Sequence, residues 1–183
     1  MRCSWVDLKD KDYIQYHDYE WGRPVHDERL LFEMLILEGF QAGLSWQCIL
    51  HKRENFKKAF DNFNVRKIAF YDEKKVKQLM QNDGLIRHKL KINASIQNAK
   101  TFLDIQNEFG SFDKYIWSWT KGKTIKADAS ITQSELSDQI SKDLKKRGMR
   151  FVGSTIIYAY LCAIGIINAH DEKCDLKDKI NPS

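Results

Sequence analysis

The sequence has little proline, little glycine and no long apolar run, and each shortage narrows what it can form. Its 183 residues include two prolines and nine glycines, with no internal repeat and no low-complexity linker. No apolar stretch reaches the roughly 18 residues needed to cross a bilayer, and the most apolar one, residues 154–168, predicts a buried helix. We therefore expect one compact unit spanning residues 1–183, with no membrane segment.

Cysteine is scarce as well, since four cysteines in a chain of this length do not make a disulfide framework. The N-terminus turns charged at once and shows no signal peptide, which favours the cytoplasm and reduced thiols. The net charge of +5 is mild. Basic residues nevertheless cluster at residues 87–91 and 142–147, where a solvated helix face and a contact with a polyanion such as nucleic acid both fit.

Helical periodicity dominates what is present. Apolar residues recur every three or four positions between the glycines, and no alternation typical of a β-hairpin stands out. Typical N-cap residues precede four of these segments, at Asp27, Ser45, Asp72 and Ser134. The expected helices cover residues 27–42, 88–107, 112–119 and 134–147, with others starting at residues 45, 72 and 153 and a polar connection over residues 120–132. The sequence thus predicts an all-α fold.

Residues of metal-ligating type stand at the two ends of the chain. Cys3 and His17 are spaced Cys-x13-His, and His170 and Cys174 are spaced His-x3-Cys, which can share one side of a helical turn. Two thiolates and two imidazoles suit a closed tetrahedral zinc site. The alternative is ordinary packing, because cysteine often behaves as a small buried apolar residue.

An aromatic-rich segment surrounds one candidate acid, Glu38. The large aromatic residues of the first quarter are Trp5, Tyr13, Tyr16, Tyr19, Trp21, Phe32, Phe40 and Trp46. Such residues are usually core, yet they could also line a slot for a flat heterocycle, on which bases stack for about 1–3 kcal/mol each. The neighbours of Glu38 are nearly all apolar, so a solvent-facing position is disfavoured, and a buried carboxylate needs a partner such as a ligand.

Two turns could contact DNA. Leu44 stands at the tip of the loop Gln41-Ala-Gly43-Leu, where an apolar side chain is either core or a wedge that fills a gap in a duplex. Between the helices near residues 134–165, Gly148 suits a C-cap, and Gly153 leaves the amides of the following helix open to a phosphate. An ordinary corner between two helices is the alternative for this second turn.

Taken together, these motifs resemble the 3-methyladenine DNA glycosylase I family of bacterial repair enzymes, nearly from end to end. The matching stretches are Arg-Cys-Ser-Trp5, Tyr-His-Asp-Tyr-Glu-Trp-Gly22, Leu-Phe-Glu-Met-Leu-Ile-Leu-Glu-Gly39, Gln-Ala-Gly-Leu-Ser-Trp46, Lys-Arg-Glu-Asn55, Ile-Arg-His-Lys-Leu-Lys-Ile92 and Lys-Lys-Arg-Gly-Met-Arg-Phe-Val-Gly153. The resemblance implies a helix-hairpin-helix fold and hydrolytic removal of 3-methyladenine from alkylated double-stranded DNA, without strand cleavage. A monomer is expected.

The resemblance also implies roles for individual residues. Glu38 would be the catalytic-site acid, with Tyr16, Trp46, Tyr13 and Trp21 binding the excised base. A structural zinc ion would join the segments 1–20 and 165–183 through Cys3, His17, His170 and Cys174, although the family pattern has one residue fewer between the first two. Contacts with DNA would come from Gly43, Leu44, Lys146, Gly148 and Gly153. The residues leave two other functions open, a non-catalytic DNA-binding module and a catalytic zinc enzyme.

Overall fold

The structure is a computed structural model that describes residues 1–180, and it is mostly helical. In chain order the elements are α1 (Lys11–Tyr19), α2 (Glu28–Gln41), α3 (Trp46–Ala59), the 3₁₀ turn η1 (Asp61–Phe63), α4 (Val65–Ala69), α5 (Glu73–Met80), α6 (Lys89–Phe109), α7 (Phe112–Ser118), β1 (Ile125–Lys126), α8 (Glu135–Lys146), α9 (Ser154–Ala163) and β2 (Ile167–Asn168). The strands β1 and β2 pair in parallel, with Ile125 opposite Ile167. The all-α prediction missed this pair because two residues are too few to show alternation.

Side-chain caps start the helices at the predicted residues. The Asp27 carboxylate, for example, accepts a hydrogen bond of 2.8 Å from the amide of Leu30 at the start of α2. Equivalent caps at the starts of α3, α5 and α8 are supplied by Ser45, Asp72 and Ser134. These four predicted starts are confirmed. The short elements η1 and α4 were not predicted, since each is less than two turns long.

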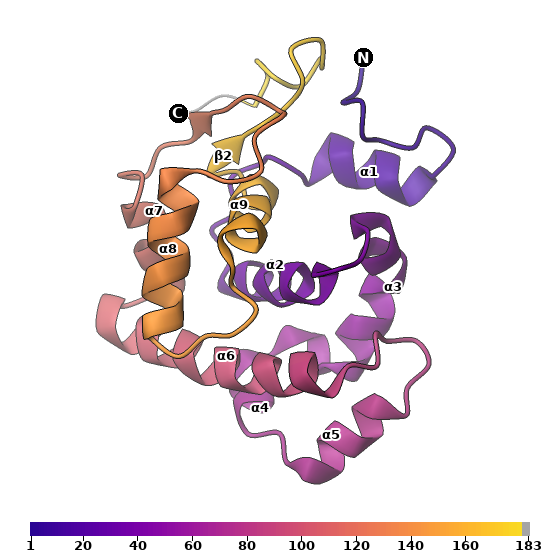
Figure 1. Cartoon of the computed structure of the whole chain (residues 1–183), viewed down its shortest axis with the longest axis vertical. Helices are drawn as coiled ribbons and strands as arrows, with labels where there is room; N and C mark the ends of the chain where they lie inside the picture. The colour runs from indigo at the N-terminus through magenta and orange to yellow at the C-terminus, as the bar shows by residue number, and fades with distance from the viewer. Residues whose placement is uncertain (181–183) are drawn as a thin grey trace.

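Helix α2 runs through the middle of the fold, where α3, α6, α7 and α9 pack around it (Figure 1). Every residue from Leu31 to Phe40 is buried. The Tyr160 hydroxyl of α9 donates to the carbonyl of Leu31 at 3.1 Å, so the two helices are also joined by a hydrogen bond. A carboxylate on this stretch of α2 therefore lies inside the protein.

The N-terminus and the last described residues, up to residue 180, lie at the same end of the molecule (Figure 1). The amide of Asp175 donates to the carbonyl of Met1 at 2.8 Å, and the amide of Ser4 donates to the Asp171 carboxylate at 2.5 Å. The last part of the predicted terminal segment, residues 181–183, is outside the described residues. Between residues 1 and 180, no helix combines the length and the apolar character that crossing a membrane requires.

Candidate active site and metal centre

A cavity of about 210 Å³ lies between α1, α2, α3, α9 and the segment that precedes α8. Its walls are mainly aromatic and apolar, with one acid. The lining residues are Trp5, Tyr13, Tyr16, Trp21, Glu38, Gln41, Trp46, Ala129, Ile131, Tyr158, Ala159, Cys162 and Ala169. The structure thus brings together all five residues that the sequence singled out for a base slot, around an open space of the size of a small heterocycle.

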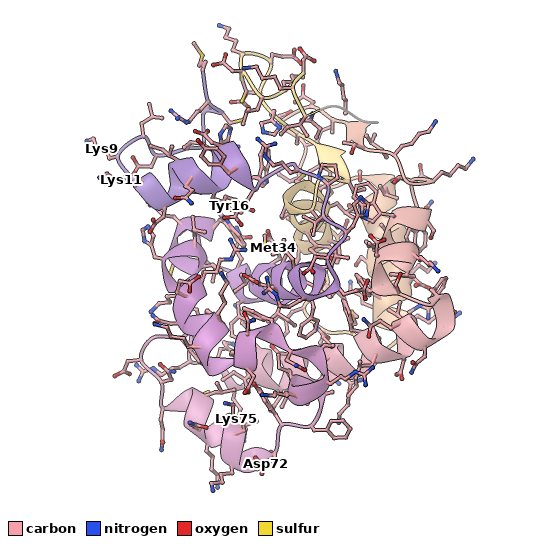
Figure 2. All side chains as sticks on the ribbon, turned by 180° about the vertical axis from the view of Figure 1, so that it is seen from behind. Lys9, Lys11, Tyr16, Met34, Asp72 and Lys75 are labelled. Atoms are coloured by element: carbon pink, nitrogen blue, oxygen red, sulfur yellow. The ribbon has the colours of Figure 1, made fainter. Side chains whose placement is uncertain are left out.

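The first wall comes from α1 and the start of α3. Tyr16 is 3% exposed and Trp46 is 8% exposed, and their ring centroids lie 5.2 Å apart at an interplanar angle of 42°. Figure 2 shows Tyr16 pointing from α1 into the molecule, while Lys11 of the same helix points outward. Tyr13, Tyr16 and Tyr19 recur every three residues in the sequence, but Tyr19 is 70% exposed. The helix turns by about 100° per residue, so a three-residue repeat drifts off one face.

Glu38 lies on α2 and is 3% exposed. Its Oε2 atom has no hydrogen-bond partner among the described residues, and burial raises the pKa of its carboxyl to about 8. Glu33, one and a half turns earlier, is fully buried too, but its oxygens accept hydrogen bonds of 2.6 Å from Arg53 and Arg29. Two buried acids on one helix thus differ in one respect: the acid at the cavity has been left without a cation.

Three further residues, Trp46, Tyr158 and Cys162, bring polar groups to the wall of the cavity. The Trp46 indole Nε1 and the Tyr158 hydroxyl are buried and, like Glu38 Oε2, have no partner in the described part of the chain. Tyr158 and Cys162 are one turn apart on α9, and burial raises the pKa of the Cys162 thiol. Their spacing was visible in the sequence, but it indicated only a buried helix.

The four predicted metal ligands converge at the end of the molecule where the termini meet. Cys3, His17, His170 and Cys174 are all buried, and one ligand atom from each lies within 4.8 Å of the others. The Cys174 Sγ and His17 Nε2 atoms are 3.5 Å apart, and His170 Nε2 has no partner within residues 1–180. This cluster can hold a metal ion.

Neighbouring groups orient both imidazoles of the cluster. His17 Nδ1 lies 2.8 Å from the Asp18 carboxylate, and His170 Nδ1 lies 2.8 Å from the Asn168 side-chain oxygen. Because these oxygens accept, the Nδ1 atoms carry the protons and each Nε2 lone pair is available to a metal. Burial lowers the pKa of His170 to about 4, which keeps it neutral, and raises the pKa of Cys3 to about 12. The predicted helical turn at His170 and Cys174 is wrong, since both residues lie outside the helices.

The cavity and the cluster share a wall of two indole rings. Trp21 lies 4.6 Å from the His170 ring, and Trp5 lies 5.3 Å from the His17 ring, as measured between centroids. The two indoles are 4.9 Å apart and both line the cavity. The histidines of the cluster therefore help to position the two indole rings that form one side of the cavity.

A buried lysine holds the loop that follows α2 in place. Lys91 is 6% exposed and donates from Nζ to the carbonyls of Phe40 and Ala42 at 2.8 and 2.6 Å. The basic cluster at residues 87–91 is thus not all solvated surface, because one member caps α2. In the same loop, Gly43 has a φ of +80° with open space around it, and Leu44 is 41% exposed.

A turn over residues 147–153 joins α8 to α9, which pack against each other. Gly148 has a φ of +103°, and Gly153 caps α9 without a side-chain hydrogen bond. The turn is braced by Asn98 of α6, which donates to the carbonyl of Arg150 at 2.9 Å and accepts from its amide at 2.8 Å. Lys145 and Lys146 are exposed beside it, so amides and cations are presented on one rigid edge.

Comparisons with known proteins match the chain over nearly its whole length. The family model for methyladenine glycosylase matches residues 5–178. DNA-3-methyladenine glycosylase 1 of Escherichia coli (strain K12) is 43% identical over 178 residues, covering 94% of this chain and 95% of that protein.

Solved structures agree with the sequence match. A crystal structure of 3-methyladenine DNA glycosylase I is 44% identical, has a TM-score of 0.92, and covers 96% of this chain and 98% of its own. A structure that addresses 3-methyladenine recognition, of the glycosylase I from Staphylococcus aureus, is 35% identical with a TM-score of 0.92 and 96% coverage of both chains.

Proposed function

Because the chain belongs to the methyladenine glycosylase family, we propose that it excises 3-methyladenine from alkylated double-stranded DNA by hydrolysis. The proposal rests above all on Glu38, a buried carboxylate without a partner at the wall of an aromatic cavity. A carboxylate left unpaired inside a protein is costly unless a ligand completes it. The ring amine of a methylated adenine is a suitable donor, and the positive charge of the alkylated nucleotide suits an anion.

Hydrolysis of the bond between the methylated base and the sugar needs little acid catalysis from the protein. Methylation at N3 makes the adenine cationic, so its bond to the sugar is already weak. The electron pair of that bond goes to the departing base, the sugar develops oxocarbenium character, and water attacks the sugar carbon. The residues of this chain bind and select: Tyr16 and Trp46 stack on the base, Tyr13 and Trp21 bound it, and Glu38 accepts from its amine and stabilises nearby positive charge.

Undamaged bases outnumber damaged ones in DNA, so the cavity must also exclude undamaged bases. An enzyme that acts on a base within a duplex swings it out of the stack. We assign Leu44 as the wedge that fills the gap, on a backbone turn that Gly43 makes possible. Its exposure of 41% leaves it free to enter a duplex, and Lys91 fixes the loop that carries it.

The α8–α9 turn is proposed as a helix-hairpin-helix grip on the phosphates. The open amides after Gly153 and the positive end of the α9 dipole attract an anion, as does Lys146, and Gly148 lets the turn close. Such contacts are independent of sequence, as a repair enzyme needs. The hairpin residues Val-Gly-Ser-Thr155 include no lysine that could attack the sugar, so we expect an abasic site and no strand cleavage.

The donor set of the cluster fits zinc. Two thiols and two imidazoles make a closed tetrahedral set, and an ion there would complete the buried His170 Nε2. Bound zinc would supply folding free energy and no reaction chemistry, because four protein ligands leave no open position. Through Cys3, His17, His170 and Cys174 it would join the terminal segments 1–20 and 165–183 of a single glycosylase unit. We place this monomer with its DNA in the cytoplasm, where its free thiols stay reduced.

The decisive experiment measures the bases released from DNA treated with a methylating agent. Incubation with the protein should release free 3-methyladenine, detected by chromatography, and untreated DNA should release none. The same products on a denaturing gel should show breaks only after alkali, which opens abasic sites. Tight DNA binding by the folded protein without any released base would support a non-catalytic binding module and contradict the proposal.

A further inference from the structure

Tyr158 carries a buried hydroxyl with nothing to bond. The residue is 4% exposed, it lines the cavity, and its hydroxyl has no partner within residues 1–180. Two buried tyrosine hydroxyls outside the cavity are paired: Tyr160 donates to the Leu31 carbonyl at 3.1 Å, and Tyr115 donates to the Asp143 carboxylate at 2.8 Å. An unsatisfied buried hydroxyl costs about 1–3 kcal/mol, so its place at the cavity points to a ligand.

The position of Tyr158 differs from that of Glu38. Tyr158 lies on α9, one turn before Cys162, on the wall that continues into Ala129 and Ile131. Glu38 lies on α2, so the two polar groups reach the cavity from different helices. A flat ligand bonded to Glu38 at one edge would therefore meet Tyr158 elsewhere on its perimeter.

The protonation state of Tyr158 defines what it can recognise. Burial, followed by the charges of Cys162 and Asp128, raises the pKa of Tyr158 to about 12, so the hydroxyl stays protonated at neutral pH. It can donate one hydrogen bond and accept others. Adenine derivatives present an amine donor and ring-nitrogen acceptors on one perimeter, which matches an acceptor at Glu38 and a donor at Tyr158.

We propose that Tyr158 is a further base-binding residue, whose hydroxyl donates to a ring nitrogen of the base held by Glu38. This inference rests on the proposed function, because it takes the ligand to be the excised purine. It also explains why α9 contributes a polar group to an otherwise apolar wall. One helix would then present its N-terminus to the DNA backbone and a side chain to the displaced base.

The test compares Tyr158→Phe with the matched control Tyr160→Phe, which removes a hydroxyl from the same helix outside the cavity. Binding of free 3-methyladenine can be followed by tryptophan fluorescence, because Trp5, Trp21 and Trp46 line the cavity. Tyr158→Phe should weaken the Kd about tenfold, as expected for one lost hydrogen bond, with Tm unchanged or raised. Tyr160→Phe should lower Tm and leave the Kd within about twofold of the wild type.

An unchanged Kd for Tyr158→Phe, or a loss no larger than that of the control, overturns the inference and leaves the proposed function intact. Wild-type protein that fails to bind free 3-methyladenine overturns both. A second measurement needs no variant: the Cζ resonance of labelled Tyr158 should move when wild-type protein is saturated with the base. A resonance that stays in place contradicts the contact.

Discussion

The cavity and the metal cluster lie on the two sides of one indole wall, and their polar atoms are arranged in opposite ways. In the cluster, four ligand atoms face one another within 4.8 Å, and Asp18 and Asn168 hold the imidazoles from behind. In the cavity, Glu38 Oε2, Trp46 Nε1 and the Tyr158 hydroxyl have no partner among residues 1–180. A site completed by one ion can be closed, whereas a site that takes and releases a base must leave its hydrogen bonds unmade.

Glu33 and Glu38 repeat this contrast on a single helix. The fully paired Glu33 joins Arg53 and Arg29 and so ties α2 to α3. Glu38 is kept unpaired at the expense of stability, which its raised pKa expresses. Mutations in the two sites should therefore act on different properties: stability for the cluster, and ligand affinity for the cavity.

The largest effect should come from opening the cluster. Cys174→Ser removes one of four metal ligands and should cost about 3–5 kcal/mol, which corresponds to a fall in Tm of about 10 °C or more. Metal analysis should show that zinc is lost with it. Cys48→Ser, at a half-buried cysteine outside the cluster, is the matched control and should retain both. A Cys174→Ser protein as stable as the wild type would remove the structural role of the cluster.

Glu38→Gln should leave the fold intact. At about pH 9, where the Glu38 carboxyl is ionised, the substitution should weaken binding of free 3-methyladenine by about 10- to 100-fold, since a hydrogen bond to a charged acceptor is worth about 1.5–3 kcal/mol. Titration by tryptophan fluorescence measures the change, and zinc content should equal that of the wild type. Equal affinity of the variant and the wild type would take Glu38 out of the base-binding site.

The same variant should change how stability depends on pH. The pKa of Glu38 is about 8 in the folded protein and near 4.5 in the unfolded chain. Between these two pH values the folded state therefore binds one more proton than the unfolded state. Stability is then lost as pH rises across this window. Glu38→Gln has no carboxyl to titrate at this position. The Tm of the variant minus the wild-type Tm should therefore increase from about pH 5 to about pH 9. Parallel Tm curves over this range would contradict the burial of an unpaired carboxyl.

A smaller change, outside both sites, separates DNA binding from base binding. Lys145→Ala with Lys146→Ala should lower DNA affinity and reduce its salt dependence by roughly one unit per lost phosphate contact. The affinity for the free base should not change. Lys74→Ala with Lys77→Ala on α5 is a control of equal charge loss on a short helix remote from the hairpin. An unaltered salt slope for Lys145→Ala/Lys146→Ala would place those lysines off the DNA.

Much of this arrangement could be predicted because its signals are local. Capping residues gave the starts of α2 and α8, and residue chemistry picked out Glu38 and the four candidate metal ligands. The role of Lys91 could not be predicted, because in sequence it is one more basic residue and only the end of α2 makes it a cap.

The far wall of the cavity was hidden for a related reason. Tyr158, Cys162 and the segment around Ile131 reach the cavity through contacts between residues more than 80 positions apart. Long-range contacts of this kind leave no periodic pattern, and an apolar helix with a tyrosine predicts only burial. A spacing can also be ambiguous: three residues between His170 and Cys174 suit a helical turn, but here an irregular turn brings them together.

The most direct test of the account is a crystal structure of the wild-type protein with free 3-methyladenine. The account predicts the base inside the cavity lined by Tyr16 and Trp46, with its amine within hydrogen-bonding distance of Glu38. A base bound elsewhere, or a Glu38 carboxyl still without a partner in the occupied cavity, would contradict it.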